Sequence, residues 1–187
     1  GEILVRGELV MQGYWNNDEA TTKTIKDGWL HTGDIGEIDE DGYICITDRK
    51  KDIIVNSGGD NIAPQRVEGM LTIEPEIAQA MVYGDKQPHL VALIVPDADF
   101  TADWFKANGG EKCELADLIE DEKFVASIRE ALDRVNSRLN TIERVRRFKL
   151  IAEPFSIDNE MLTPSMKIRR HVIKGCYGDD LEALYGS

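Results

Sequence analysis

The sequence lacks several features that would place it in other classes of protein. No apolar run approaches the roughly 18 residues that a membrane-spanning helix needs. The only cysteines are Cys45, Cys113 and Cys176, an odd number at wide spacing, which argues against a disulfide framework or a zinc site and fits a reducing cytoplasm. Cationic residues are also few: the sequence has 22 Lys and Arg against 35 Asp and Glu, which gives a net charge of −13. That balance opposes nucleic-acid binding, which needs cations to displace counterions from phosphates, but a local cationic pocket could still hold a small phosphate ligand.

The chain also lacks the signals of a self-contained or exported protein. Its first residues form no signal peptide, carry no initiating Met and read as the middle of a strand, so we expect an excised piece of a longer protein. There is no Gly/Ser/Thr-rich phosphate-binding loop and no internal repeat. The three histidines show no metal-ligand spacing, so we expect no metal site within this sequence.

What is present predicts an α+β architecture in two parts. Residues 1–48 are rich in glycine and short β-type runs, with strands expected at 2–6 and 43–47 and an Asp-Gly hairpin turn at 41–42. The charged residues 49–52 interrupt this pattern and form a candidate boundary. We therefore expect a β-rich end of a large domain, followed by a smaller domain.

The second part, residues 52–187, predicts a small mixed sheet with flanking helices. A helix should begin at Pro64, which suits a first helical turn. The apolar spacing of Phe124 to Leu139 predicts an amphipathic helix over 121–140, and its stripe is most simply core. The remaining expected elements are antiparallel strands at 80–83 and 90–95 joined by a turn at 84–88, a helical and acidic insertion at 97–120, a strand at 148–151, and helices at 167–175 and 179–185.

Three segments contain residues that suit chemistry. The Thr-Gly-Asp run ending at Asp34 can aim a carboxylate outward, and a carboxylate accepts hydrogen bonds from two hydroxyls, as a ribose offers. In residues 48–64, three cations precede Gly58-Gly59, which lets the backbone turn and approach a ligand closely. Lys167 follows a Pro-containing loop that should be exposed. Taken singly, these could be an ordinary turn, a solvated charged loop and a helix start with surface cations.

In this order, the segments resemble the adenylate-forming superfamily of acyl-CoA synthetases, luciferases and peptide-synthetase adenylation domains. The motifs are Gly13-Tyr14-Trp15, the run 27–34, Asp48-Arg49-Lys50-Lys51-Asp52, and Lys167 near the end. The run 58–64 with Val67-Glu68 looks most like the long-chain fatty acyl-CoA synthetases, whose C-terminal portion the chain is similar to. The resemblance implies ATP and coenzyme A as substrates, and a C-terminal lid domain at 52–187 joined by a hinge at 49–51.

The resemblance also implies roles for individual residues. Asp34, Ile46 and Arg49 match nucleotide-binding positions, with Asp34 and Arg49 reaching the ribose. Lys51 matches the hinge about which the lid swings between two poses.

On the lid, the resemblance assigns one residue set to each half-reaction. Ser57, Gly58 and Gly59 match a loop that faces coenzyme A in the second pose. Lys167 matches the catalytic lysine of adenylate formation, where a compact ammonium offsets charge that crowds the transition state. The chain departs from the commoner Ser-Gly-Lys pattern by carrying Met166 before that lysine, and Val55 and Ser57 stand where coumarate ligases and luciferases carry lysines, which argues against an aromatic substrate.

Several parts of the family site are missing from this sequence. The phosphate loop, the Mg²⁺-binding glutamate and the acyl tunnel belong to the large N-terminal domain, so we expect the missing domain as partner, Mg²⁺ ligands outside this chain, and no activity from the chain alone. A ligase that loads another carboxylate onto a carrier protein, and a non-catalytic interaction module, remain alternatives. We expect a cytoplasmic protein, and peripheral contact with the inner membrane stays open because long-chain substrates are greasy.

Overall fold

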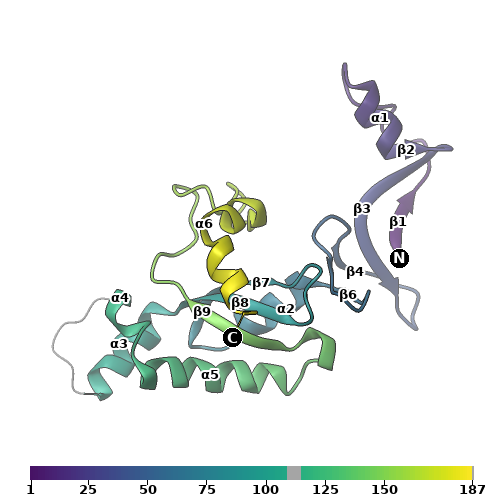
Figure 1. Cartoon of the computed structure of the whole chain (residues 1–187). Coiled ribbons are helices and arrows are strands. Elements are labelled where there is room, and N and C mark those ends of the chain that lie inside the picture. Colours follow the sequence, from purple (N-terminus) through teal and green to yellow (C-terminus); the bar gives the residue numbers. More distant parts are fainter. Residues whose placement is uncertain (109–114, 187) are drawn as a thin grey trace. The chain divides into compact units, whose positions relative to one another are not determined.

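The α+β class is confirmed by the computed structural model, which describes residues 1–108 and 115–186. The chain divides into two compact units, Gly1–Ile53 and Ile54–Ser187 (Figure 1). Each unit is described by itself below.

The first unit is built around one long strand. β3 (Trp29–Ile38) pairs antiparallel with three others, which are β1 (Glu2–Val5), β2 (Ile25–Lys26) and β4 (Ile44–Arg49). The expected hairpin turn is confirmed: the Asp39 carboxylate accepts hydrogen bonds from the backbone N–H groups of Asp41 and Tyr43, and Gly42 takes φ +88°. A helix that the sequence pattern did not predict, α1 (Asp18–Thr24), buries none of its residues and is capped by Asn17.

Burial in the first unit is unusually slight for a folded segment. Across residues 1–53, all of which are described, Asp48 is the only buried residue, and it is polar. Large apolar side chains lie on the surface, including Trp15, Tyr43, Ile44 and Ile46. This unit therefore holds its strands by backbone pairing without an apolar core of its own.

The second unit contains a three-stranded mixed sheet in the order β7-β8-β9. β8 (Leu90–Pro96) pairs antiparallel with β7 (Ile77–Tyr83) and parallel with β9 (Val145–Leu150). The other elements are the hairpin of β5 (Ile54–Val55) and β6 (Asn61–Ile62), α2 (Pro64–Leu71), α3 (Ala98–Ala107), α4 (Leu115–Leu118), α5 (Glu122–Asn136), the 3-10 helix η1 (Thr141–Glu143) and α6 (Arg170–Ala183).

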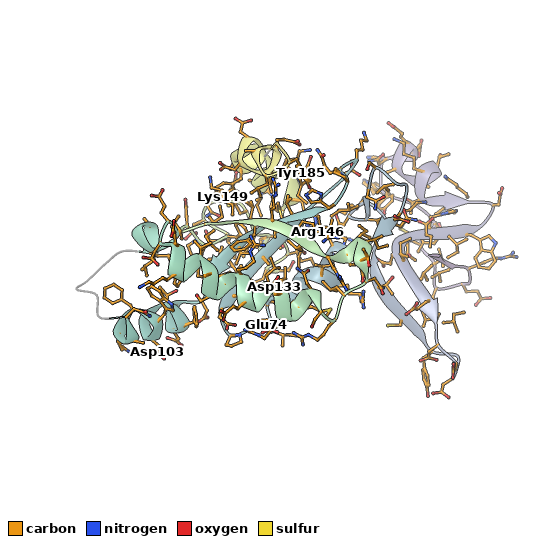
Figure 2. The ribbon with its side chains drawn as sticks, turned by 60° about the horizontal axis from the view of Figure 1, so that its bottom comes forward. Glu74, Asp103, Asp133, Arg146, Lys149 and Tyr185 are labelled. Atoms are coloured by element: carbon orange, nitrogen blue, oxygen red, sulfur yellow. The ribbon has the colours of Figure 1, made fainter. Side chains whose placement is uncertain are left out.

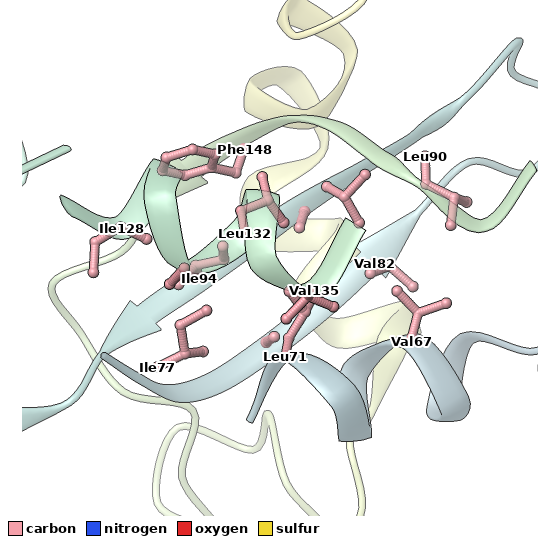
Figure 3. Close-up of a cluster of buried hydrophobic side chains, with 14 of the residues drawn as sticks. Val67, Leu71, Ile77, Val82, Leu90, Ile94, Ile128, Leu132, Val135 and Phe148 are labelled. Atoms are coloured by element: carbon pink, nitrogen blue, oxygen red, sulfur yellow. The ribbon is translucent and has the colours of Figure 1, made fainter. Parts of the chain in front are cut away.

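Both faces of β8 are buried, and every residue of the strand is inaccessible. Leu90, Ala92 and Ile94 face a core formed with α2 and α5 (Figure 3). Val91, Leu93 and Val95 face a second core formed with α6 and the segment before it. Alternation of side chains along a strand thus divides the interior into two layers, one on each side of the sheet.

The expected elements of this unit differ from the observed ones mainly at their ends. α5 stops at Asn136 and η1 follows, and β9 begins at Val145, before the expected strand start. The last helix starts at Arg170, so the expected start at Lys167 is wrong, and it runs through Gly175 with a non-helical residue at Tyr177. In the expected insertion, 98–107 and 115–118 are helical, while 109–114 lie outside the described residues. None of the described helices has the length and apolar character needed to cross a membrane.

The apolar stripe of α5 generates a stability prediction. Leu132 is fully buried against the sheet, so Leu132→Ala should lower the free energy of unfolding by about 2–5 kcal/mol through lost burial and a residual cavity. Exposed Glu130 on the same helix is the control, and Glu130→Ala should change that free energy by no more than about 0.5 kcal/mol. Urea unfolding of the 187-residue chain followed by circular dichroism measures both. Equal effects of the two variants would contradict the assignment of this stripe to the core.

Candidate active site

Asp34 and Arg49 form an ion pair across neighbouring strands of the first unit. β3 and β4 pair in a register that sets Asp34 opposite Arg49. The Arg49 Nε donates to Asp34 Oδ1 at 2.9 Å, and both side chains remain partly accessible. One carboxylate oxygen is thus engaged by the guanidinium, while the other can accept further hydrogen bonds.

The backbone around Asp34 holds this carboxylate in place. Gly33 adopts φ +73°, a left-handed conformation that favours glycine, and its carbonyl accepts a 2.8 Å hydrogen bond from the Lys50 N–H. The Thr32 hydroxyl accepts from the Asp34 N–H and donates to the Ile3 carbonyl. The turn motif suggested that Asp34 lies at the end of a strand. The structure instead places Asp34 within a ten-residue strand.

Within the described residues 1–108, Ile46 and Lys51 make no hydrogen bond or ion pair with the side chains of this ion pair. The register of β3 and β4 shifts between Ile35 and Gly36, so Ile46 pairs with Gly36 and lies on the sheet face of Asp34 and Arg49, with its side chain exposed. Lys51 is exposed in a turn in which the N–H groups of Asp52 and Ile53 donate to the Arg49 carbonyl, just before the division between the two units. The nucleotide role of Ile46 and the hinge role of Lys51 stay predictions.

A second polar cluster of the first unit was not predicted. Glu2 Oε2 lies 2.9 Å from Lys50 Nζ and 3.1 Å from His31 Nδ1, so one carboxylate ties β1 to β3 and to the residue after β4. Hydrogen bonds from Lys50 and then from His31 lower the pKa of Glu2 to about 2. No local sequence pattern predicts this cluster, because its members are distant in sequence and each is an ordinary surface residue type.

The Ser57-Gly58-Gly59 loop of the second unit is shaped by its neighbour Asn56. The Asn56 Oδ1 accepts 2.9 Å hydrogen bonds from the N–H groups of both Gly58 and Asp60, and Gly59 takes φ +86°. The loop rests on the turn between β7 and β8, since the Ser57 N–H donates to the Gln87 carbonyl at 3.0 Å. The loop is thus a fixed turn with its two glycines exposed.

Lys167 lies on a tight turn between buried residues. The Thr163 N–H donates to the Lys167 carbonyl at 2.9 Å, and the Thr163 hydroxyl accepts from the Lys167 N–H at 3.0 Å. Met166 takes φ +60°, the left-handed conformation in which the commoner glycine is unstrained. The Lys167 side chain is exposed and makes no hydrogen bond or ion pair with the part of the chain that the structure describes. The ammonium is therefore presented to solvent on an ordered turn.

These positions fall into two sets. Asp34, Ile46, Arg49 and Lys51 belong to the first unit, whereas Lys167 and the loop at 57–59 belong to the second. Among the described residues, 1–108 and 115–186, no three His, Cys, Asp or Glu side chains group as metal ligands. The first set offers a carboxylate of which one oxygen is engaged by a guanidinium, and the second offers an exposed ammonium and an exposed glycine turn.

The Glu2 cluster generates a pH-dependent prediction. Because the pKa of Glu2 is depressed from the ordinary 4.5 to about 2, its ion pairs should stabilise the first unit fully above about pH 4.5 and be lost as pH falls through about 2. Carboxyl NMR titration of the chain measures this pKa directly, and Lys50→Met should raise it. An ordinary Glu2 pKa in the unsubstituted chain would contradict the observed contacts.

The match to a family model covers most of the chain. Residues 51–187 match the model described as the AMP-binding enzyme C-terminal domain. Over 186 residues the chain is 41% identical to the long-chain-fatty-acid–CoA ligase FadD15 of Mycobacterium tuberculosis, covering 99% of this chain and 31% of the ligase. It is 36% identical to long-chain-fatty-acid–CoA ligase 1 of Cavia porcellus, covering all of this chain and 27% of that one. The chain thus spans about a third or less of these relatives.

Solved structures agree with that match. The adenylation domain of a carboxylate reductase from Mycobacterium chelonae superposes with a TM-score of 0.84 at 25% identity, covering all of this chain and 28% of that one. O-succinylbenzoate coenzyme A synthetase from Bacillus subtilis, solved with AMP, gives a TM-score of 0.63 at 28% identity, covering 91% of this chain and 29% of that one. With the family model, these likenesses confirm the predicted resemblance: the chain belongs to the AMP-binding enzyme family and carries its C-terminal domain.

Proposed function

We propose that the chain is the C-terminal part of an AMP-forming ligase that activates a long-chain fatty acid with ATP and transfers it to coenzyme A. The observation that carries this is the presentation of Lys167, whose exposed ammonium lies on a hydrogen-bonded turn and pairs with none of the described residues. The 41% and 36% identities to long-chain-fatty-acid–CoA ligases support the fatty acid as substrate class.

The first half-reaction needs positive charge at the phosphate. The fatty carboxylate attacks the α-phosphorus of ATP, the acyl-adenylate forms and pyrophosphate leaves. Lys167 brings one ammonium between two negatively charged reactants, which offsets their repulsion and orients them. Asp34 accepts hydrogen bonds from the ribose hydroxyls with the carboxylate oxygen that Arg49 leaves open, and Arg49 keeps that carboxylate oriented.

The second half-reaction has different requirements. The coenzyme A thiol attacks the acyl carbonyl, loses its proton, and AMP leaves, so no ammonium is needed at the phosphate. The glycine turn at 57–59 then allows close backbone approach to the pantetheine arm. We assign residues 1–48 to the end of the large domain, 49–51 to a hinge centred on Lys51, and 52–187 to a lid that alternates between these two tasks.

The exposed apolar surface of the first unit supports the view that another part of the protein covers it. Ile38 pairs with Ile44, and Ile46 lies two residues farther along β4, so these three exposed side chains share one face of the sheet. Contiguous exposed apolar surface is typical of an interface. We assign the covering partner to the preceding N-terminal domain, together with the phosphate loop, the acyl tunnel and the Mg²⁺ ligands. The sparse, widely spaced cysteines support a cytoplasmic setting for the parent enzyme.

Carrier-protein loading is the alternative that one comparison favours. The adenylation and carrier-protein didomain of a carboxylic acid reductase from Segniliparus rugosus gives a TM-score of 0.81, but at 26% identity. Identity to the CoA ligases is higher over the same residues, and we therefore prefer free coenzyme A as acceptor. The rate of transfer to coenzyme A against transfer to a phosphopantetheinylated carrier protein separates the two.

Lys167→Ala in the full-length parent tests the role of the lysine. Adenylate formation from palmitate and ATP should fall by about 10²–10³-fold or more, as removal of a transition-state charge partner does. Thioester formation from pre-made palmitoyl-adenylate and coenzyme A should change little. Lys123→Ala is the control, since Lys123 is an exposed lysine of the same unit on α5. Survival of both half-reactions in Lys167→Ala would remove the basis of the proposal.

The isolated 187-residue chain gives a second test. With ATP, Mg²⁺, palmitate and coenzyme A it should form no palmitoyl-CoA above the protein-free blank, because the acyl and phosphate sites lie elsewhere. Mass spectrometry of the thioester measures this. Turnover by the pure chain would show that the missing domain is not needed.

A further inference from the structure

A buried ion pair lies close to the turn that carries Lys167. Arg170, the first residue of α6, donates to both carboxylate oxygens of Glu68 at 2.6 Å. Glu68 belongs to α2 and is only 6% exposed. A bidentate, desolvated pair of this kind is geometrically demanding, and removing one partner leaves an uncompensated charge.

The same pair closes the edge of the sheet. β7 is an edge strand, and the Val82 N–H donates to Glu68 Oε1 at 2.8 Å while the Val82 carbonyl accepts from Arg170 at 3.3 Å. α2 packs in the core on one face of β8, and α6 packs in the core on the other. Glu68 and Arg170 therefore join the two layers around the edge strand. Arg170 lies three residues beyond Lys167 in the sequence.

The side chains beside the turn confirm that α2 and the Lys167 segment face each other. An open pocket of about 230 Å³ is lined by Glu68 and Gly69 of α2 and by Met166 and Ile168, the residues on either side of Lys167. The base of the turn is closed by the Leu162–Ile168 bridge and by the Arg169 N–H, which donates to the Met161 carbonyl at 2.8 Å. The Glu68–Arg170 pair adds a direct connection between the helix that follows the turn and α2.

The other end of α6 supports the glycine loop. Glu182 accepts from the Tyr83 hydroxyl at 2.9 Å and from the Gln87 side-chain amide at 3.0 Å. The Gln87 carbonyl in turn accepts the Ser57 N–H at 3.0 Å. α6 rises from the sheet above β7 and β8, with Tyr185 beyond its end (Figures 1 and 2). One helix thus connects with the lysine turn at its start and with the glycine loop near its end.

We propose that Arg170 and Glu182 are positioning residues for different half-reactions: Arg170 sets Lys167 for adenylate formation, and Glu182 sets the loop at 57–59 for transfer to coenzyme A. The inference rests on the proposed function. Neither residue needs to touch a substrate. Arg170 acts through its ion pair with Glu68 on α2, and Glu182 acts through the turn that carries Gln87.

Arg170→Lys in the full-length parent tests the first half. Lysine keeps the charge but cannot form the bidentate pair. The kcat of adenylate formation from palmitate and ATP should fall about 10–10²-fold, the effect of an ångström-scale misplacement, with the KM for ATP little changed. Thioester formation from palmitoyl-adenylate should stay within about two-fold. Glu68→Gln is a second variant: its amide oxygen can still accept from the Val82 N–H and from Arg170, but the second oxygen and the carboxylate charge are lost, so it should slow the same step.

Glu182→Ala in the full-length parent tests the proposed role of Glu182 and should affect the other half-reaction. Thioester formation from palmitoyl-adenylate and coenzyme A should slow about 10-fold, while adenylate formation stays within about two-fold. Glu182→Gln can still accept one hydrogen bond and should recover part of the loss. Because Glu182 is exposed, its replacement should leave the fold intact.

Arg134→Lys provides the matched control. Arg134 on α5 also binds carboxylates through more than one hydrogen bond: its Nη2 donates to both oxygens of Glu76 at 2.7 and 2.8 Å, and its Nε donates to Glu74 at 2.8 Å. Its contacts lead to neither loop. This variant should lower the Tm without changing the ratio of the two half-reaction rates.

The outcomes separate the inference from the function on which it rests. A changed rate ratio in Arg134→Lys, or an unchanged one in Arg170→Lys or Glu182→Ala, would overturn the inference while Lys167→Ala still blocks adenylate formation. If Lys167→Ala itself leaves adenylate formation intact, the proposed function and the inference both fail.

Discussion

The second unit depends on the burial of both faces of β8. A strand with seven inaccessible residues needs a packed layer on each side, and the chain supplies α2 and α5 on one and α6 on the other. These layers fix the two segments that carry candidate chemistry, because the turn of Lys167 leads directly into α6 and the glycine loop leads through β6 into α2. The functional turns are short and exposed, but they begin and end at buried elements. Rigid elements with exposed turns are a common way to hold catalytic groups.

The first unit depends on a different constraint, the register between β3 and β4. That register places Asp34 beside Arg49, and a slip of one residue would turn either side chain to the opposite face. The unit has no buried apolar residue, so register and the Glu2 contacts to Lys50 and His31 hold it together. The Asp34 carboxylate is thereby oriented by an arginine within the strand pair itself.

The local sequence pattern was sufficient to predict those helices and strands whose apolar residues recur with the period of a buried face. The apolar run at 90–95, the turn before it and the stripe of α5 all fold as expected, because each element is recognisable within a short window. Order and spacing of motifs were sufficient to predict the family. Pattern did not predict long-range contacts: Glu68 and Arg170 are separated by 102 positions, and no local pattern indicates that they pair.

The start of the last helix shows a second reason for failure. Helix propensity alone allows a start at Lys167, but the Thr163 hydrogen bonds and the left-handed Met166 keep this segment in a turn until Arg170. α1 was missed for the converse reason, since a helix that buries nothing has no apolar period to detect. The candidate residues themselves came from the resemblance, and the structure adds how each is held.

We propose that the second unit serves both half-reactions as a lid that changes its pose about Lys51. Among the residues that the structure describes, each unit has one exposed cysteine, Cys45 on β4 and Cys176 on α6. Spin labels at these two sites, in a full-length parent with its other thiols replaced, report the distance between the large domain and the lid by pulsed electron resonance. With a non-hydrolysable acyl-adenylate analogue, adding coenzyme A should shift the distance distribution to a second, separate peak. A single distribution that coenzyme A leaves unchanged would contradict the two-pose account.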